Sequence, residues 1–191
     1  MALFKQRLKP RMLAERVVLA AGAWSSHEME HPASESLNVR PVKGQSVVLR
    51  GERVIGRIVQ TPDVYVVPRG DETIVGASVE EQSFDARPRA GAVRELLKRA
   101  FEVLPSIDEL EIAALPVSFR PAVADHMPVI GPGGGSGFYV ATGHYRNGML
   151  LAPATAGYLA EMIESGRVPP AIAPFTMDRL ARERGATPSG G

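Results

Sequence analysis

Two segments of the sequence carry a polar side chain suited to holding a small anion within an apolar run. Tyr65 follows Val64 at the start of the run VYVVPR, and Arg120 closes another run before Pro121. An arginine at the end of a buried strand needs an anion, and its planar fork of N–H donors fits a carboxylate with two hydrogen bonds. Two structural alternatives stand beside this interpretation: a core tyrosine whose hydroxyl is satisfied internally, and an ion pair between Arg120 and one of the chain's own acids.

A third segment, GHYRNG at residues 143–148, is a polar loop bounded by glycines. It lies between a predicted buried strand and a predicted helix. Backbone N–H groups at the start of a helix, together with the helix dipole, favour anionic ligand groups. The loop therefore predicts either an anion-binding site or an ordinary helix cap.

The segment HEMEH at residues 27–31 matches the zinc-hydrolase pattern H-E-x-x-H, in which two histidines bind the metal and the glutamate is the base. His27, Glu28 and His31 would take those roles. Pro32 follows directly and disfavours helical geometry at His31, and the next residues supply no third histidine. We therefore expect a solvated helix end here and rank a zinc hydrolase last among the functions.

Apolar periodicity places these segments on a mixed α/β framework rich in hairpins. Strands are predicted at residues 17–23, 45–50, 57–61, 64–68, 73–78, 110–119 and 138–142. The first and the last of these are expected to be buried, and each ends at a glycine turn. A hairpin turn is predicted at residues 69–72 and a break in the strand at Pro116.

Two helices complete the framework. Apolar residues spaced by three and four between Val93 and Leu104 predict a helix of about four turns that Pro105 ends. A second helix is expected at about 150–165, with Pro153 in its first turn, where no N–H is missed. From Val168 onward the composition predicts a tail that frays.

The composition is that of a globular protein with no electrostatic preference for nucleic acid or membrane. Of the 191 residues 45% are apolar, and 22 Lys and Arg against 21 Asp and Glu leave a net charge of +1. The absence of cysteine excludes disulfides, a thiol nucleophile and a cofactor attached through sulfur. The apolar run after Arg16 has seven residues, too short for a membrane span and a poor secretory signal. We expect a cytoplasmic protein that binds neither nucleic acid nor membrane.

Taken in order, five parts of the sequence resemble the C-terminal half of the flavin-dependent amine oxidases of the D-amino acid oxidase superfamily. They are VVLAAGAWS at 17–25, RPVKGQ at 40–45, YVVPR with IVGAS at 65–69 and 74–78, FRPAVADHMPVIG at 119–131, and GHYRNGMLLAP at 143–153. The last is most similar to the glycine oxidase branch, which serves thiamine biosynthesis. Sarcosine oxidases, which tether flavin through cysteine, fit less well. The resemblance implies FAD, bound non-covalently.

The resemblance also implies roles for individual positions. Arg120 and Tyr65 match the residues that hold the substrate carboxylate, and Arg146 matches a second arginine at the edge of substrate and flavin. Val79 stands near a position where relatives often carry a methionine, which leaves the preferred amino acid open. The residues implied to lie at the flavin are Ala21, Gly22, His144, Tyr145, Arg146, Asn147, Gly148, Met149 and Leu150.

The implied reaction is the oxidative deamination of glycine or a similar small amino acid or amine. Dioxygen is the second substrate, and the products are a 2-oxo acid, ammonia and hydrogen peroxide. Catalysis would come from orientation of the substrate, since the cofactor supplies the chemistry and no protein nucleophile is needed. The alternative from another class is a non-catalytic carboxylate-binding or partner subunit that keeps Arg120 and Tyr65 without meeting a flavin.

One part of the family pattern is missing from the sequence. The family binds the FAD pyrophosphate through a strand–GxGxxG–helix unit, and the glycines of GGGSG at 133–137 do not match it because a strand follows them. We therefore expect a truncated or split C-terminal portion that works beside a separate N-terminal FAD-binding chain or has little activity. An exposed sheet edge would favour a homo-oligomer.

The expected fold class is mixed α/β, with an antiparallel-rich sheet beside the C-terminal part of a split FAD-binding domain. We expect residues 37–121 to form the substrate-binding sheet domain, and residues 1–36 and 122–180 to be the remaining parts of the FAD-binding domain. Residues 181–191 are expected to be a flexible tail.

Overall fold

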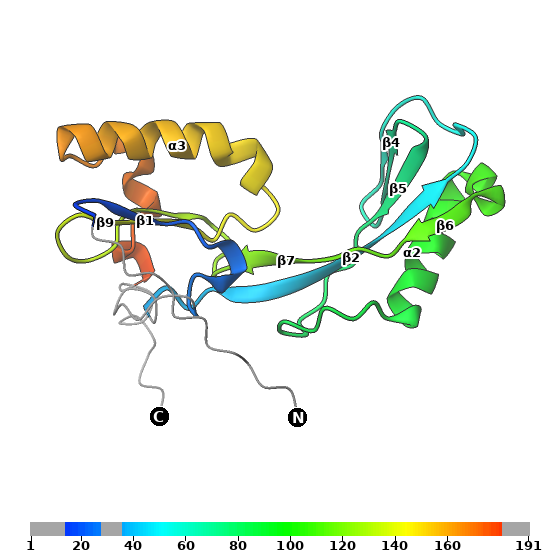
Figure 1. Cartoon of the computed structure of the whole chain (residues 1–191), viewed down its shortest axis with the longest axis horizontal. Helices are drawn as coiled ribbons and strands as arrows, with labels where there is room; N and C mark the ends of the chain where they lie inside the picture. Colours follow the sequence, from blue (N-terminus) through cyan, green and yellow to red (C-terminus); the bar gives the residue numbers. More distant parts are fainter. Residues whose placement is uncertain (1–13, 28–35, 181–191) are drawn as a thin grey trace.

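Two sheets organise the residues that the computed structural model describes, which are 14–27 and 36–180. Each sheet forms a lobe, and the lobes are joined by the long strands β2 and β7, so that the molecule is elongated (Figure 1). The mixed α/β fold class predicted from the sequence is confirmed. No helix in these two ranges is long and apolar enough to cross a membrane.

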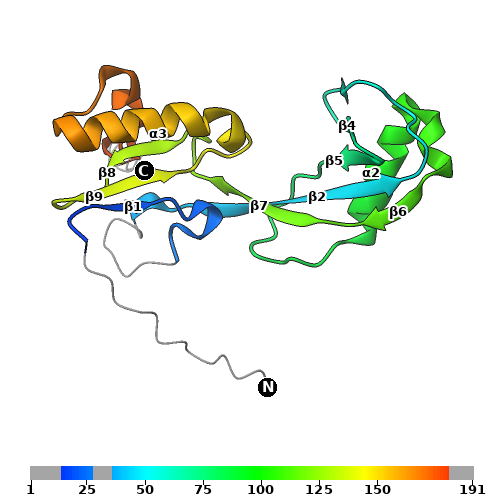
Figure 2. The ribbon, with the colours of Figure 1, turned by 45° about the horizontal axis from the view of Figure 1, so that its top comes forward.

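The first sheet has three strands in the order β1-β9-β8. Their bounds are Val17–Leu19 for β1, Val129–Pro132 for β8 and Phe138–Thr142 for β9. β1 runs parallel to β9, and β8 pairs antiparallel with β9. The helix α3 (Gly148–Ser165) lies over one face of this sheet (Figure 2). The run of glycines at 133–137 is the β8–β9 hairpin connection, as predicted.

The second sheet is larger and antiparallel, with β2 at its centre. Its path is β3-β4-β5-β2-β6, and β7 pairs with the first half of β2. The strand bounds are β2 Arg40–Arg50, β3 Val59–Gln60, β4 Tyr65–Arg69, β5 Glu72–Gly76, β6 Glu111–Ala114 and β7 Val117–Ala122. The turn between β4 and β5 and the break at Pro116 lie where the sequence predicts them.

Helices and short 3₁₀ turns complete the described part. The helix α2 is Ala90–Val103, and its buried residues Leu96 and Ala100 belong to the predicted apolar stripe. The 3₁₀ turns are η1 Gly22–Trp24, η2 Pro105–Glu109 and η3 Pro170–Phe175.

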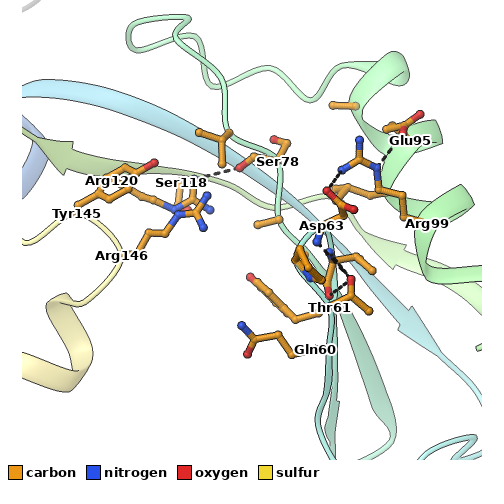
Figure 3. A pocket seen from close by; sticks show the side chains of 18 of the residues that line it. Gln60, Thr61, Asp63, Ser78, Glu95, Arg99, Ser118, Arg120, Tyr145 and Arg146 are labelled. Carbon is orange, nitrogen blue, oxygen red and sulfur yellow. Dashed lines mark hydrogen bonds and ion pairs between the residues drawn. The ribbon is translucent and has the colours of Figure 1, made fainter. Parts of the chain in front are cut away.

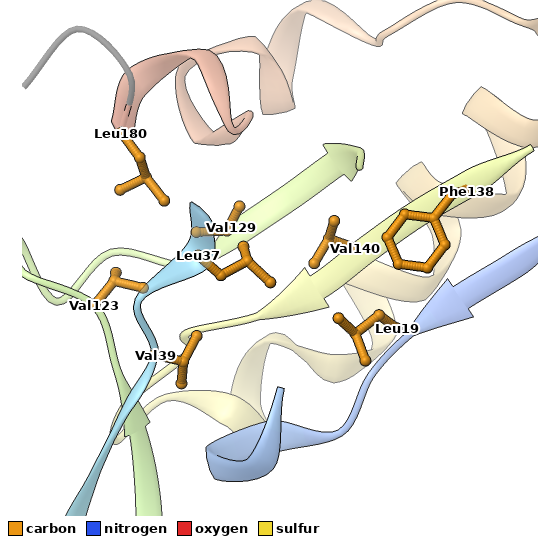
Figure 4. Packing of buried hydrophobic residues seen from close by; sticks show 8 residues of the cluster. All are labelled: Leu19, Leu37, Val39, Val123, Val129, Phe138, Val140 and Leu180. Carbon is orange, nitrogen blue, oxygen red and sulfur yellow. The ribbon is translucent and has the colours of Figure 1, made fainter. Parts of the chain in front are cut away.

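Separate apolar clusters stabilise the lobes. In the first lobe the cluster comprises Leu19, Leu37, Val39, Val123, Val129, Phe138, Val140 and Leu180 (Figure 4). A smaller cluster joins α3 and η3 to β8 through Leu159, Met162, Ile172 and Ile130. The second lobe packs α2 on its sheet through Val47, Leu49, Val64, Val66, Val75, Leu96, Ala100 and Ile107. Because β2 lies beside both, it is the element that connects the two cores.

The structure corrects four predictions about elements. The strand predicted at 45–50 begins at Arg40, because residues 40–45 pair with β7. Val17 and Val18, predicted to be buried, are 38% and 42% exposed because β1 lies at the edge of its sheet. Pro153 lies beyond the first turn of α3, since that helix begins at Gly148.

The fourth correction concerns the end of the described chain. The segment from Val168 was predicted to fray, but residues 168–180 pack against the first lobe, where Ile172 and Leu180 are 2% and 7% exposed. Apolar residues spaced among prolines pack here through a 3₁₀ turn, which helix and strand periodicity do not detect. The predicted tail at 181–191 lies outside the described residues, and the domain boundaries stay a prediction.

Candidate functional site

A cleft of about 1010 Å³ lies between the second sheet, α2 and the loop that precedes α3 (Figure 3). Tyr65, Arg120 and Arg146, the three residues predicted to bind substrate, all line it. They come from β4, β7 and the loop before α3. Three segments far apart in the sequence are thus brought to one cavity.

The Arg120 side chain crosses β2 from one neighbour to the other. It starts on β7, passes over Gly44 of β2, and its Nη1 donates to the carbonyl oxygen of Ser78 at 3.0 Å. A Cβ built on Gly44 would lie 2.6 Å from Nη1 and 2.7 Å from Cζ, so that only glycine leaves room for the guanidinium. β2 and β7 thereby support the guanidinium beside the cleft.

Arg120 has no carboxylate within ion-pair distance among the residues that the structure describes. Partial burial lowers the pKa of its guanidinium, and the positive charge of Arg146 acts in the same direction. A partly buried cation beside a second cation needs an anion. The alternative interpretation, an ion pair with one of the chain's own acids, therefore finds no support in the described residues.

Tyr65 lies against Gly76 on the neighbouring strand β5, its partner in the sheet register. A Cβ on Gly76 would overlap the Tyr65 ring and hydroxyl, so that this glycine makes room for the phenol. Within the described ranges no residue forms a hydrogen bond with the hydroxyl, which lines the cleft. The alternative of a core tyrosine satisfied internally is therefore not supported.

Arg146 belongs to a stack of planar groups at the other side of the cleft. Its guanidinium carbon lies 5.5 Å from the centroid of the Tyr145 ring. Tyr145 also stacks on His126, with ring centroids 4.5 Å apart and an angle of 15° between the planes. Arg40 Nη2 is 3.0 Å from His126 Nε2 and so connects the stack to β2. The N–H of Tyr145 also donates to Pro121 O at 2.9 Å. This hydrogen bond and the stack together fix the position of the loop.

The start of α3 presents unpaired donors and apolar side chains. Asn147, the residue before the helix, makes no side-chain hydrogen bond to the first turn. Met149 and Leu150 are 94% and 79% exposed, which is unusual for apolar residues beside a cavity. His144 is anchored away from solvent by Thr155, 3.0 Å from Nε2 to Oγ1, and burial lowers the pKa of its imidazole.

Ala21 and Gly22 lie near this loop but not in the cleft. Because β1 and β9 run parallel, the turn after β1 and the loop after β9 leave the same edge of the sheet. Thr142, the last residue of β9, donates through Oγ1 to Gly22 O at 3.1 Å. Their predicted contact with a cofactor stays a prediction, as it does for His144, Asn147 and Leu150, which also do not line the cleft.

The sequence reasoning missed several residues of the site. Gly44 and Gly76 make room for the side chains of Arg120 and Tyr65. The carbonyl oxygen of Ser78 accepts a hydrogen bond from Arg120. Asp63 and Arg99 line the wall of the cleft at α2. A glycine inside a strand is a known sign of close approach by another group. That signal could have found Gly44 and Gly76, but no sequence pattern pointed to Ser78.

The HEMEH segment does not gain support as a metal site. Glu28 and His31 lie outside the described residues. His27 lies against Phe84, with ring centroids 5.6 Å apart. Within residues 14–27 and 36–180 no three histidine or acidic side chains are grouped so that they could hold a metal ion.

Comparison with known proteins assigns the chain to a family. The model of the FAD dependent oxidoreductases called DAO matches residues 6–162. This chain belongs to that family of FAD-dependent oxidoreductases. The predicted resemblance, the oxidoreductase class and FAD as the family's cofactor are confirmed.

The relatives of this chain include glycine oxidases. The chain is 36% identical over 170 residues to the glycine oxidase of Geobacillus kaustophilus. This alignment covers 87% of the chain and 45% of the relative. The chain is 33% identical over 181 residues to the bifunctional protein ThiO/ThiG of Trichormus variabilis, covering 92% of this chain and 27% of the relative. The crystal structure of the G. kaustophilus glycine oxidase superposes with a TM-score of 0.76 at 35% identity, over 86% of this chain and 45% of that one. The chain thus spans less than half the length of these relatives.

The residues around the start of α3 fit the flavin of this family of oxidoreductases. The first-turn N–H groups of a helix favour the polar, electron-rich edge of a ring that becomes anionic when reduced. The exposed side chains of Met149 and Leu150 offer an apolar surface for a planar aromatic group. Residues 145–150 are therefore the ones that would hold the flavin ring when FAD is bound, and this contact stays a prediction.

Proposed function

We propose that this chain holds the carboxylate of glycine or of a similar small amino acid or carboxylate-bearing amine and presents its α-carbon to FAD for oxidative deamination. The observation that carries the proposal is the Arg120 guanidinium, which lines the same cleft as the Tyr65 phenol and has no carboxylate partner in the described residues. Two donors on separate strands would fix a carboxylate, and its orientation fixes the α-carbon.

The reaction consumes the amino acid, dioxygen and water and yields a 2-oxo acid, ammonia and hydrogen peroxide. Bound FAD supplies the oxidation, since it accepts two electrons from the substrate and delivers them to dioxygen. The residues of this chain bind and orient: Arg120 and Tyr65 at the carboxylate, and Arg146 at the edge shared by substrate and cofactor. Water then converts the imine product to the oxo acid and ammonia.

The proposal includes a setting for the reaction. A role in thiamine biosynthesis in the cytoplasm follows from the resemblance to glycine oxidases. The partners that we propose are a separate FAD-binding chain that supplies the GxGxxG unit of the family and a second copy of this chain.

Reconstitution with FAD tests the proposal. We expect the chain, alone or with an FAD-binding partner chain, to take up flavin and to show its yellow absorption band. Glycine should then release hydrogen peroxide, and Arg120→Ala should abolish that release. The matched control is Arg57→Ala, which removes an exposed arginine that does not line the cleft.

The outcome also separates the second candidate function. Glycine or glycolate binding that Arg120→Ala abolishes, in a protein that takes up no flavin with any partner, would identify a non-catalytic carboxylate-binding subunit. Peroxide release that survives Arg120→Ala would contradict both functions.

A further inference from the structure

The segment between β5 and α2, residues 77–89, crosses the side of β2 and is called the strap here. It continues the line of β5: the N–H of Ser78 donates to Gln45 O at 3.0 Å, and Lys43 and Glu80 exchange backbone hydrogen bonds of 2.9 and 3.0 Å. Ser78 lines the cleft. The position of the strap therefore sets the part of the cleft wall that contacts Arg120.

Two buried polar side chains of β2 hold the strap in place. Lys43 is fully buried, and its Nζ donates to the carbonyl of Arg87 at 2.7 Å. Gln45 is 1% exposed; its Nε2 donates to Glu80 Oε1 at 2.5 Å, and its Oε1 accepts the N–H of Arg89 at 2.6 Å. Buried polar groups are costly unless they are paired, so these contacts select one position of the strap.

A continuous series of hydrogen bonds runs from these side chains to Arg120. The same oxygen of Glu80 accepts from Gln45 and from the Ser78 hydroxyl. The Ser78 hydroxyl oxygen also accepts the N–H of Gln45 at 2.9 Å. The carbonyl of Ser78 then accepts from Arg120 Nη1 at 3.0 Å. Fixing Ser78 from both its side chain and its backbone thereby fixes one edge of the guanidinium.

We propose that Gln45 and Glu80 are positioning residues for carboxylate recognition by Arg120. The proposal rests on the proposed function, in which Arg120 holds the substrate carboxylate. An arginine side chain has several rotatable bonds, and its fork binds both carboxylate oxygens only in one orientation. Gly44 limits the guanidinium from below, and the strap limits it from the side, so that its remaining N–H groups are available to the cleft.

Titration of the full chain with glycolate, followed by NMR, tests this role without FAD. Glycolate is a two-carbon carboxylate, and its uncharged amide, glycolamide, reports on binding that does not use the carboxylate. We expect Glu80→Ala to lower glycolate affinity about fivefold, within the usual range of coupling between residues of one network, and to leave glycolamide affinity unchanged. Glu80→Gln should restore most of the affinity, because an amide oxygen can accept the same two hydrogen bonds.

The matched control is Gln82→Ala on the same strap, since within the described residues the Gln82 side chain forms one hydrogen bond, from Lys43 Nζ at 3.5 Å, and none with Ser78. It should bind glycolate as the wild type does. If Glu80→Ala does not fold, Ser78→Ala replaces it, because this variant removes only the hydroxyl between Glu80 and the backbone. Ser78→Ala should give the same loss that is selective for glycolate.

The Arg120→Ala background separates this inference from the proposed function. If Glu80 acts through Arg120, Glu80→Ala has no further effect on glycolate affinity in that background. Equal losses for glycolate and glycolamide, or a loss that persists without Arg120, would overturn the positioning role alone. Wild-type glycolate affinity in Arg120→Ala itself would overturn the proposed function, and the inference with it.

Discussion

Arg120 and Tyr65 each lie against a glycine of the neighbouring strand, Gly44 and Gly76. In both places the side chain predicted to bind substrate packs against a glycine, which has no Cβ. The site is therefore specified as much by the absence of two Cβ atoms as by the presence of a guanidinium and a phenol. This dependence can be tested separately from the ligand residues themselves.

Gly44→Ala is expected to weaken glycolate binding about tenfold, which corresponds to ~1.4 kcal/mol. The new methyl group would meet the guanidinium at 2.6–2.7 Å, and the flexible arginine can move away at little cost to the fold. Glycolate affinity and the thermal midpoint are both measured. Gly56→Ala is the control, because a Cβ there has no atom within 4 Å. A large fall in the midpoint with unchanged affinity would contradict the prediction.

His144 gives the stability of the chain a pH dependence with a definite sign. Burial lowers the pKa of its imidazole in the folded state, so that the unfolded chain binds a proton more readily. The stability contributed by neutral His144 is complete above the unfolded pKa of roughly 6.5 and is lost as the pH falls below it.

Urea unfolding between about pH 5 and pH 7.5, the window in which histidine titrates, measures this effect. We expect the free energy of unfolding to rise with pH in the wild type and to rise less in His144→Gln. The acids whose pKa is lowered by arginine neighbours, Glu72 and Glu95, change their protonation at lower pH. His126→Gln, a histidine at the surface, is the comparison. Identical slopes in wild type and His144→Gln would refute the assignment.

At the scale of elements, the start of α3 carries donors that its own sequence does not satisfy. Asn147→Asp places a carboxylate where Asn147 makes no capping hydrogen bond. A negative charge at a helix N-terminus stabilises the helix by about 0.5–1 kcal/mol, so we expect a higher free energy of unfolding. The same charge should lower FAD affinity, since it competes for these N–H groups.

Unfolding in urea and FAD titration measure the two effects of Asn147→Asp in one protein. Gln82→Glu, at an exposed position outside the described helices, is the control. The opposite signs are the diagnostic result. A gain in stability with unchanged FAD affinity would show that these donors do not face the cofactor.

Helices and strands with a regular spacing of apolar residues could be predicted from the sequence. Strands that form because they pair with a distant segment could not. The stripe from Val93 to Leu104 and the alternation around the 69–72 turn follow from local spacing, and α2 and the β4–β5 hairpin lie there. The first half of β2 carries Pro41, Lys43 and Gly44, which do not alternate between apolar and polar. Pairing with β7 and the strap makes it a strand.

The candidate site shows the same division. Tyr65, Arg120 and Arg146 stand out as polar residues in apolar or glycine-bounded segments, and the structure places all three in one cleft. Lys43 and Gln45 look like surface residues in the sequence, yet both are buried, because the strap supplies acceptors from residues about 35–45 positions away. Contacts over such separations leave no local pattern.

At the scale of the whole molecule, β2 belongs to both lobes. Its first half pairs with β7 next to the cluster that contains Val140, and its second half contributes Val47 and Leu49 to the cluster that contains Val75. A lobe that unfolded alone would break this strand in the middle. The two cores are therefore expected to unfold together.

Trp24, the only tryptophan of the chain, makes this testable because it reports on one side of the molecule. It stacks on Phe84 and meets Phe119 of β7 edge to face, whereas Val75 lies in the core of the other lobe. Val75→Ala and Val140→Ala remove two buried methyl groups each and should cost about 2 kcal/mol each. If the cores are coupled through β2, both variants shift the urea transition seen by Trp24 fluorescence by similar amounts. Val103→Ala, at a 38% exposed position, should leave it in place. If the Trp24 transition moved with Val140→Ala but not with Val75→Ala, the lobes would unfold independently. In that case β2 would align the two walls of the cleft without coupling the stability of the two lobes.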